Sequence, residues 1–507
     1  MSARRLVTLA LFVSTFLVSL DTAVISTAMP TVIGQIGGIH LYAWVFSAYL
    51  LTSTVTVPIY GKLADLYGRK PVFLVSTTLF MLASMLCGQA QSMEQLIAFR
   101  LLQGVGAGGM LPMTQTILGD VYPLEERARI TGLFSSVWGV SGLLGPAIGG
   151  FFTEHTSWRW VFYVNTPLCI LTIALVASFL HEHVEHKRHR IDFLGAVLLS
   201  AAVVSLLVGL QNQMPWLYLL AAVLTPLFIW QERRAPEPVV PLHLFTQRVI
   251  GICTLGGLLI GWLLYGQSTF VPPFVQGVLG ATPTLTGFVM AGASIGWPLT
   301  SAIGGRLVLR WGWRMPSIVG AVLLIIGFGM LWQMPPDAGL WYPTFLQFVT
   351  GAGFGFMSLV FIIAAQNAVG WEQRGVVTSA NQFARSIGGT IGVSIAGAIF
   401  SAGVANATGA GVDPNDLLSP TIRATLPPVQ LEVLQGALVG ALHSVYFLFA
   451  LVAALGVVVA SLLPGGRPSQ TDADARGRRQ PDGEADTDLA PRLQERGSLS
   501  AGPSPGR

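Results

Sequence analysis

Long apolar windows separated by short polar breaks fill the chain as far as residue 463. A bilayer core about 30 Å thick needs about 20 helical residues, so windows of that size bounded by charges, Pro or Gly clusters predict transmembrane helices. The sequence predicts fourteen of them, over residues 6–27, 41–60, 71–91, 94–118, 129–151, 159–180, 192–210, 215–230, 249–275, 284–304, 315–333, 340–366, 375–402 and 437–463.

Composition narrows the class of protein further. Of the 507 residues, 52% are apolar and only 10% are charged, and the mean hydropathy is +0.64. A soluble domain needs a charged surface, and soluble chains typically have about 25% charged residues. The composition therefore excludes a soluble fold and indicates an all-α polytopic membrane protein.

The basic residues are distributed unevenly over the predicted loops. The N-terminus, the loops on its side of the membrane and the C-terminal tail hold 24 of the 28 Lys and Arg residues, whereas the opposite loops hold only Arg159 and Arg423. Cytoplasmic loops are the ones enriched in Lys and Arg, so both termini are predicted to be cytoplasmic. The net charge of +4 reflects this topology and indicates no nucleic-acid partner.

The polar ends of the chain and its cysteines add little chemistry. The basic N-terminus resembles a signal peptide, but its removal would leave an odd number of helices, so we expect a retained first span. Residues 464–507 are too polar to bury a core and are predicted to be a disordered tail. Cys87, Cys169 and Cys253 lie far apart in apolar windows, so no metal site or disulfide is expected.

An internal repeat divides the chain. The segment Gly61–Lys70 after the second window is similar to Gly305–Arg314 after the tenth, 244 residues later. Duplication predicts two six-helix halves with two helices inserted between them, the architecture of a secondary transporter whose halves rock about a central site. The expected divisions are residues 1–180 and 249–463 for the halves, 181–248 for the inserted helices and 464–507 for the tail.

Four motifs resemble those of a known family. They are the loop Gly61–Lys70, the segment Arg100–Gly106, the segment Gly142–Gly150 and the segment Trp158–Asn165. The loop resembles the signature of the major facilitator superfamily, and together the motifs resemble its fourteen-helix drug:proton antiporter branch. The resemblance implies the major facilitator fold and proton-coupled export of lipophilic drugs or toxic compounds from a bacterial cytoplasmic membrane, by a monomer that uses the proton gradient and no cofactor.

Asp21 is the one acidic residue well inside a predicted span. Loss of hydration favours the neutral form of a carboxyl group, so such a residue suits proton coupling, with a structural polar contact as the alternative. Arg100 lies at a similar depth in the fourth span, about six residues or 9 Å from the outer end. It is expected either to pair with Asp21 or to brace helix carbonyls. The branch usually has Thr and Asn where this chain has Ala23 and Ser26, which removes one source of polar support.

Glycine patterns indicate two candidate gating segments. The fifth span carries two stripes of small residues, which favour close helix packing and, by resemblance, a seal between the halves. One stripe is Gly142, Pro146 and Gly150, and the other is Gly145 and Gly149. In the signature loop, weak exposed ion pairs suit a latch that breaks in each cycle, although topogenic charge is the alternative; its residues are Gly61, Asp65, Gly68, Arg69 and Lys70.

The resemblance also places a substrate cavity between spans 1, 4, 9 and 12. Those spans offer aromatic, Met and amide side chains suited to lipophilic ligands, although any single one of them is more often a lipid-facing or core residue. The candidates are Met113, Gln115, Tyr265, Gln267, Phe354, Phe356, Met357 and Gln366. The lack of further buried acids disfavours a site for multiply charged cations and favours a monovalent cation or a neutral amphiphile as substrate.

Other functions find little support in the sequence. No phosphate-binding loop, metalloprotease motif or nucleophile elbow is present, so neither an enzyme nor ATP-driven transport is expected. The His-rich segment 181–189 is interpreted as a solvated loop and not as a metal site. A dedicated exporter of a lipid, siderophore or secondary metabolite, and a non-transporting receptor or scaffold, are the alternatives to a drug exporter. The expected partners are the lipid bilayer, protons and a lipophilic small molecule.

Overall fold

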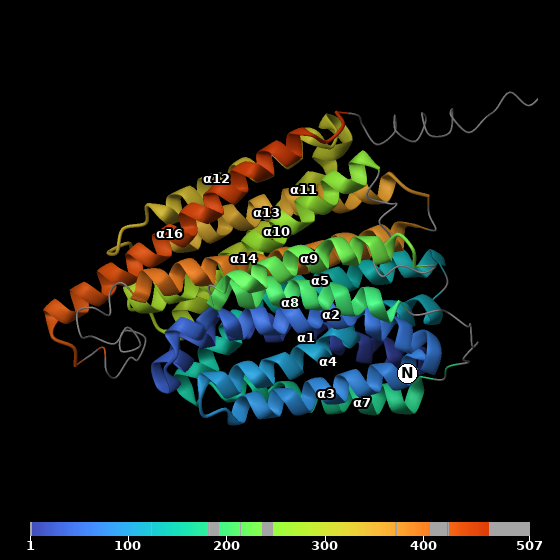
Figure 1. Ribbon diagram of the computed structural model, residues 1–507, viewed down its shortest axis with the longest axis horizontal. Coiled ribbons are helices and arrows are strands. Elements are labelled where there is room, and N and C mark those ends of the chain that lie inside the picture. Colours follow the sequence, from blue (N-terminus) through green and yellow to red (C-terminus); the bar gives the residue numbers. More distant parts are fainter. Residues whose placement is uncertain are drawn as a thin grey trace, which may run out of the picture.

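The computed structural model describes residues 3–122, 124–180, 182, 192–212, 214–235, 247–370, 373–405, 423 and 425–465. The elements over these residues are helices (Figure 1). Those of 15 residues or more are α1 (Ala3–Ile36), α2 (Tyr42–Tyr67), α3 (Arg69–Gln89), α4 (Met93–Val121), α5 (Leu124–His155), α7 (Asn165–Phe179), α8 (Phe193–Asn212), α9 (Pro215–Glu232), α10 (Arg248–Pro273), α11 (Pro283–Trp311), α12 (Arg314–Trp332), α13 (Trp341–Asn367), α14 (Arg374–Ala405) and α16 (Pro428–Ser461). Each of the fourteen predicted windows coincides with one of these helices. Among the described residues, ten segments are long and apolar enough to cross a membrane.

The sixth window is divided into two helices. A single turn, α6 (Trp160–Tyr163), precedes α7, and the break falls at Val164. Pro167 explains it, because its ring nitrogen cannot donate to the carbonyl of Tyr163 and its ring would clash there in a continuous helix. The break lies next to Asn165, which is fully buried.

The helices form two sets with the same internal pairing (Figure 1). In the first set α1 packs on α5, while α2 and α3 pack on α4. In the second set α10 packs on α14, while α11 and α12 pack on α13. Corresponding helices in these pairs are those related by the sequence repeat. The two sets meet where α5 contacts α11 and where α2 contacts α14.

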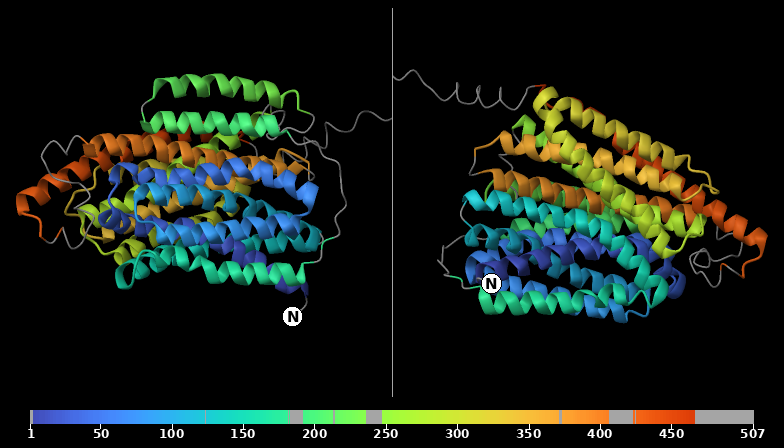
Figure 2. Two further views of the ribbon diagram at one scale, coloured as in Figure 1. Left: turned by 60° about the horizontal axis from the view of Figure 1, so that its bottom comes forward. Right: turned by 180° about the vertical axis from the view of Figure 1, so that it is seen from behind.

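The helices α8 and α9 lie outside this bundle. Figure 2 shows the pair on one side of the molecule, with α9 outermost. α8 packs against both α2 and α14, and α9 packs on α8. Large apolar side chains on α9, including Trp216, Leu219 and Trp230, are exposed. Such a surface is suited to contact with lipid and not with water.

Glycine brings paired helices into backbone contact. A Cβ added at Gly388 of α14 would lie 2.0 Å from the carbonyl oxygen of Leu258 in α10, and one at Gly261 would lie 1.8 Å from that of Arg385. The equivalent pair in the first set behaves alike, since a Cβ at Gly149 would lie 2.5 Å from the oxygen of Val24. Close approach of small residues is a main source of helix association in membranes.

A methyl group at Gly388 is therefore expected to destabilise the protein. Gly388→Ala forces α10 and α14 apart, and overpacking of this kind costs about 1–3 kcal/mol. Gly440→Ala in α16 is the matched control, because nothing lies within 4 Å of the added methyl. Thermal unfolding in detergent checks the prediction: the midpoint falls for Gly388→Ala and does not fall for Gly440→Ala. Equal midpoints would contradict the packing described here.

Candidate functional site

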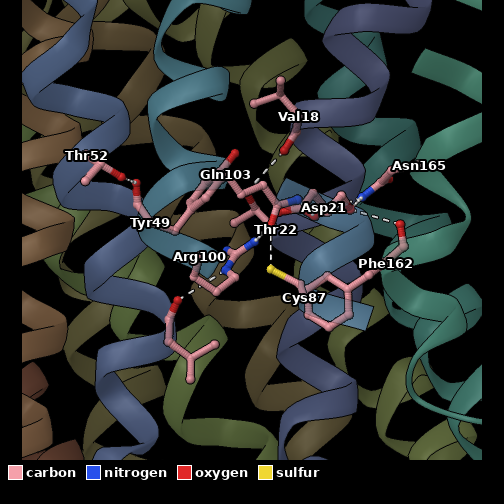
Figure 3. A network of polar contacts seen from close by, with 12 residues as sticks. Val18, Asp21, Thr22, Tyr49, Thr52, Cys87, Arg100, Gln103, Phe162 and Asn165 are labelled. Atoms are coloured by element: carbon pink, nitrogen blue, oxygen red, sulfur yellow. Dashed lines mark hydrogen bonds and ion pairs between the residues drawn. The ribbon is translucent and has the colours of Figure 1, made fainter. Parts of the chain in front are cut away.

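The structure brings Asp21 of α1 and Arg100 of α4 together inside the first set of helices (Figure 3). The guanidinium NH1 of Arg100 donates to Oδ2 of Asp21 at 2.7 Å, and the two side chains are 1% and 0% exposed, respectively. Two charges this far from water require close pairing and further hydrogen bonds to be tolerated. The contact that the depth argument allowed is thus present.

Two amides complete the surroundings of the carboxylate. Nε2 of Gln103 donates to Oδ1 of Asp21 at 2.8 Å, and Nδ2 of Asn165 donates to the same oxygen at 3.0 Å. Gln103 lies one turn after Arg100 on α4, and Asn165 enters from the start of α7. Ser26 takes no part, because its hydroxyl donates to the carbonyl of Ala23 at 2.7 Å. The support that Ala23 and Ser26 do not provide comes from other helices.

Arg100 is held by more than Asp21. Its Nε donates to the carbonyl of Val45 at 3.3 Å, its NH1 also donates to Oε1 of Gln103 at 2.7 Å, and its guanidinium lies 4.0 Å from the centre of the Tyr49 ring. Both expected roles of Arg100 are therefore realised, since it pairs with Asp21 and also binds a helix carbonyl. The cation–π contact adds stabilisation that does not depend on Asp21.

This hydrogen-bonding pattern suits a carboxylate. The three described partners of Asp21 all donate to it, so they match an acceptor-only group. Because the Asp21 side chain is fully buried in this arrangement, movement of α1, α4 or α7 is needed to expose it to solvent. The site can therefore couple a change of charge to a change of helix packing.

The signature loop holds helix ends together within one set. The carboxylate of Glu182 accepts hydrogen bonds from the backbone N–H groups of Arg69 and Lys70 at 2.7 and 2.9 Å, and Lys70 Nζ donates to the carbonyls of Ala177 and Leu180. Gly68 supplies the turn, with φ of 90°. Gly61 has open space beside it. The side chain of Asp65 lies outside the described residues.

The repeated copy of this loop makes an equivalent contact. Arg314 corresponds to Lys70 at the repeat spacing, and its Nε donates to the carbonyl of Leu463 at 2.9 Å. Leu463 follows α16 as Leu180 follows α7. In each half the last basic residue of the loop thus binds a carbonyl just beyond its final long helix, which is α7 in the first half and α16 in the second. This contact needs no Asp65 counterpart, which the second copy lacks.

The two small-residue stripes of α5 contact two different helices. Cβ atoms added at Gly145 and Gly149 would meet α1, at Ala23 and Val24. The other stripe faces α11: a Cβ at Gly142 would lie 2.8 Å from the hydroxyl of Ser294, one at Gly150 would lie 2.5 Å from the carbonyl of Pro283, and Gly287 of α11 approaches the carbonyl of Pro146. One stripe therefore packs within the first set, while the other forms part of the junction with the second.

The candidate cavity residues are found in several environments. Met113 is buried in the core of the first set, whereas Gln115 is exposed on α4. Phe354, Phe356 and Met357 pack on helices of the second set, namely α11, α12 and α16.

The polar candidates of the second set also bind neighbours. Gln267 donates to Gln347 of α13, and Gln366 donates to Thr378 of α14. Tyr265 packs against the first-set cluster that contains Leu17 and Tyr49, so among these candidates it is the one that meets the opposite half.

Polar contacts join the sets at the end of the bundle opposite the N-terminus. Nε2 of Gln276 donates to the backbone carbonyl of Thr27 at 2.8 Å, and the hydroxyl of Ser401 donates to the backbone carbonyl of His40 at 3.1 Å. Arg423 fixes the same segment by donating to the carbonyls of Gln276 and Gly277. Burial lowers the pKa of the Arg423 guanidinium, but arginine still keeps its charge at physiological pH. These contacts hold the two sets together at this end of the bundle.

Two helical sets related by a repeat, one of which holds a buried ion pair, are typical of a secondary membrane transporter, and comparison with known proteins gives the family. The Major Facilitator Superfamily model matches residues 11–393, and the chain belongs to that family. It is 37% identical to the Multidrug transporter protein MdtP of Bacillus subtilis over 411 residues, 79% of this chain and 76% of the relative.

Two further similarities agree with this. The chain is 31% identical to Multidrug resistance protein 3 of Bacillus subtilis over 499 residues, 93% of this chain and 97% of the relative. The fold is similar to that of an inward-facing bacterial homolog of the human lysosomal transporter Spinster, with a TM-score of 0.66, 16% identity, and coverage of 92% of this chain and 97% of that one. At such low identity the structure supports the fold alone.

Removal of Arg100 alone is expected to destabilise the protein more than removal of both charges. Arg100→Met leaves a buried carboxylate without its counter-charge, which costs about 3–5 kcal/mol, whereas Asp21→Asn combined with Arg100→Met leaves no charge to stabilise. Thermal unfolding midpoints in detergent should place the single variant below the double variant. A double variant as unstable as Arg100→Met would argue against the pair as the source of the effect.

Proposed function

We propose that this transporter is a proton-coupled exporter of lipophilic drugs or other toxic compounds across the bacterial cytoplasmic membrane. The observation that carries the proposal is the ion pair of Asp21 and Arg100, buried where α1, α2, α4 and α7 meet. A buried ionisable group inside a membrane bundle is costly and marks ion or proton pathways. The multidrug relatives supply the substrate class.

Protonation of Asp21 is the coupling step. A neutral carboxyl group loses its attraction for Arg100 and no longer matches three hydrogen-bond donors. Arg100 keeps the Val45 carbonyl and the Tyr49 ring, so its charge is not left without partners. The contact that weakens is therefore the one between α1 and α4, and this favours a different arrangement of the two helices.

The direction of transport follows from the predicted topology. With both termini in the cytoplasm, the end at which Gln276 of one half binds Thr27 of the other is the outer one. A substrate then enters from the cytoplasm or inner leaflet and leaves when this end opens. Entry of one proton through 100 mV supplies about 2.3 kcal/mol for the cycle. No cofactor is required, and a monomer contains the whole proposed pathway.

Asp21→Asn is expected to abolish uphill transport while leaving substrate binding in place, because the amide keeps the shape of the side chain and cannot cycle a proton. The measurement uses proteoliposomes with an imposed pH gradient and follows uptake of a lipophilic dye together with proton release. Asp337→Asn is the matched control, since Asp337 is an exposed carboxylate in the loop between α12 and α13. This control variant should transport like wild type.

Two outcomes would overturn parts of the proposal. Uphill transport by Asp21→Asn at the wild-type rate would remove Asp21 from the coupling step. If wild type moves neither dye nor protons, the polyspecific drug exporter is wrong, and a dedicated lipid or metabolite substrate becomes the next hypothesis. Equal dye binding by wild type and Asp21→Asn would show that the variant is folded.

A further inference from the structure

Arg385 is a second cation within the described membrane-spanning helices. It lies in α14, nine residues or roughly 14 Å inside the span Val376–Ala405. Lys and Arg side chains near helix ends reach back to the membrane surface, but a residue at this depth does not. A buried cation normally has a carboxylate or a set of carbonyls beside it, so its partners decide its role.

The partners of Arg385 are few. Its NH2 donates to Oε1 of Gln382, one turn earlier on the same helix, at 2.7 Å. Its Nε is buried without a hydrogen-bond partner, and no carboxylate among the described residues forms an ion pair with it. Arg100 differs completely, with Asp21, a carbonyl and an aromatic ring around it. The Arg100 site is internally neutral, whereas the Arg385 site carries an uncompensated positive charge.

Arg385 lies beside the part of α10 that meets the first half. Its backbone packs on Gly261 of α10, and the ring of Tyr265, one turn further along α10, packs on Gly389, one turn after Arg385. Tyr265 also packs against the first-set cluster that contains Tyr49, whose ring stacks on Arg100. Arg385, Gln382 and Tyr265 each remain partly exposed. The side chain of Arg385 is therefore partly exposed beside the residue of α10 that meets the first half.

A second unpartnered donor lies between the same two helices, α10 and α14. Nε1 of Trp262, on α10, is buried without a hydrogen-bond partner among the described residues. The Trp262 side chain packs against Gly392 of α14, where an added Cβ would lie 2.5 Å from the indole ring. Buried donors in native proteins are nearly always satisfied. Two unpartnered buried donors thus lie along the interface between α10 and α14.

We propose that Arg385 binds the anionic group of a lipophilic substrate, so that amphiphiles with a carboxylate, sulfonate or phosphate group belong to the substrate range. A guanidinium donates in a planar fork that matches these groups, and an anion would neutralise the buried charge. Tyr265 and the neighbouring apolar side chains would contact the lipophilic part. This inference rests on the proposed function for transport, but its binding step does not depend on proton coupling.

The test compares two dyes that differ by one anionic group. 8-Anilino-1-naphthalenesulfonate and the neutral N-phenyl-1-naphthylamine share one aromatic body, and both are titrated into purified full-length protein in phosphatidylcholine nanodiscs, with empty nanodiscs subtracted. Arg385→Gln is expected to weaken binding of the sulfonate by about tenfold or more, the value of a charge-assisted hydrogen bond, and to change binding of the neutral dye by less than about twofold. Arg385→Lys should lie between wild type and Arg385→Gln.

The control is Arg310→Gln, which removes an exposed charge near the end of α11 and should change neither affinity. The inference is overturned if Arg385→Gln weakens both dyes equally, if it weakens neither, or if wild type binds no sulfonate above the empty nanodiscs. Because no gradient is applied, failure here leaves proton-driven transport of the neutral dye intact. Conversely, a selective loss of sulfonate binding would stand even if Asp21→Asn transported normally.

Discussion

The pairing of Asp21 with Arg100 is the interaction on which the organisation of the first half depends. Each charge is removed from water, so each needs close pairing and further hydrogen bonds to be tolerated. Gln103 and Asn165 supply those bonds, and Asn165 is the first residue of α7, directly after the break between α6 and α7. One ion pair thereby constrains the relative positions of several helices, and a change in its protonation reaches all of them.

The sequence repeat shows how the two halves have diverged around this centre. At the repeat spacing of 244 residues, Asp21 corresponds to Tyr265 and Gln103 corresponds to Gln347. The amide is retained in both halves, but in the second half Gln347 accepts a hydrogen bond from Gln267 in place of binding a carboxylate. The helix pairs and the loop contacts to α7 and α16 are preserved, while the ionisable pair is confined to one half.

Prediction from the sequence succeeded where a single physical rule applies. A bilayer demands apolar helices, so each predicted window contains a helix, and the constant helical rise placed Asp21 and Arg100 at one depth. Gln103 and Asn165 were not predicted, because an uncharged amide inside an apolar span gives no signal of its own and the sequence does not say which helices are neighbours. Phe354 illustrates the same limit, since its helix was expected to line a cavity but its side chain packs within the second set.

The isolated charge of Arg385 has an electrical consequence. The Asp21–Arg100 pair is neutral as a unit, so the membrane potential does little work on it when the first half moves. Arg385 has no described counter-charge, and each displacement of α14 along the membrane normal therefore carries charge through part of the field. Movement of α14 in the unloaded protein is therefore expected to depend on the membrane potential through Arg385.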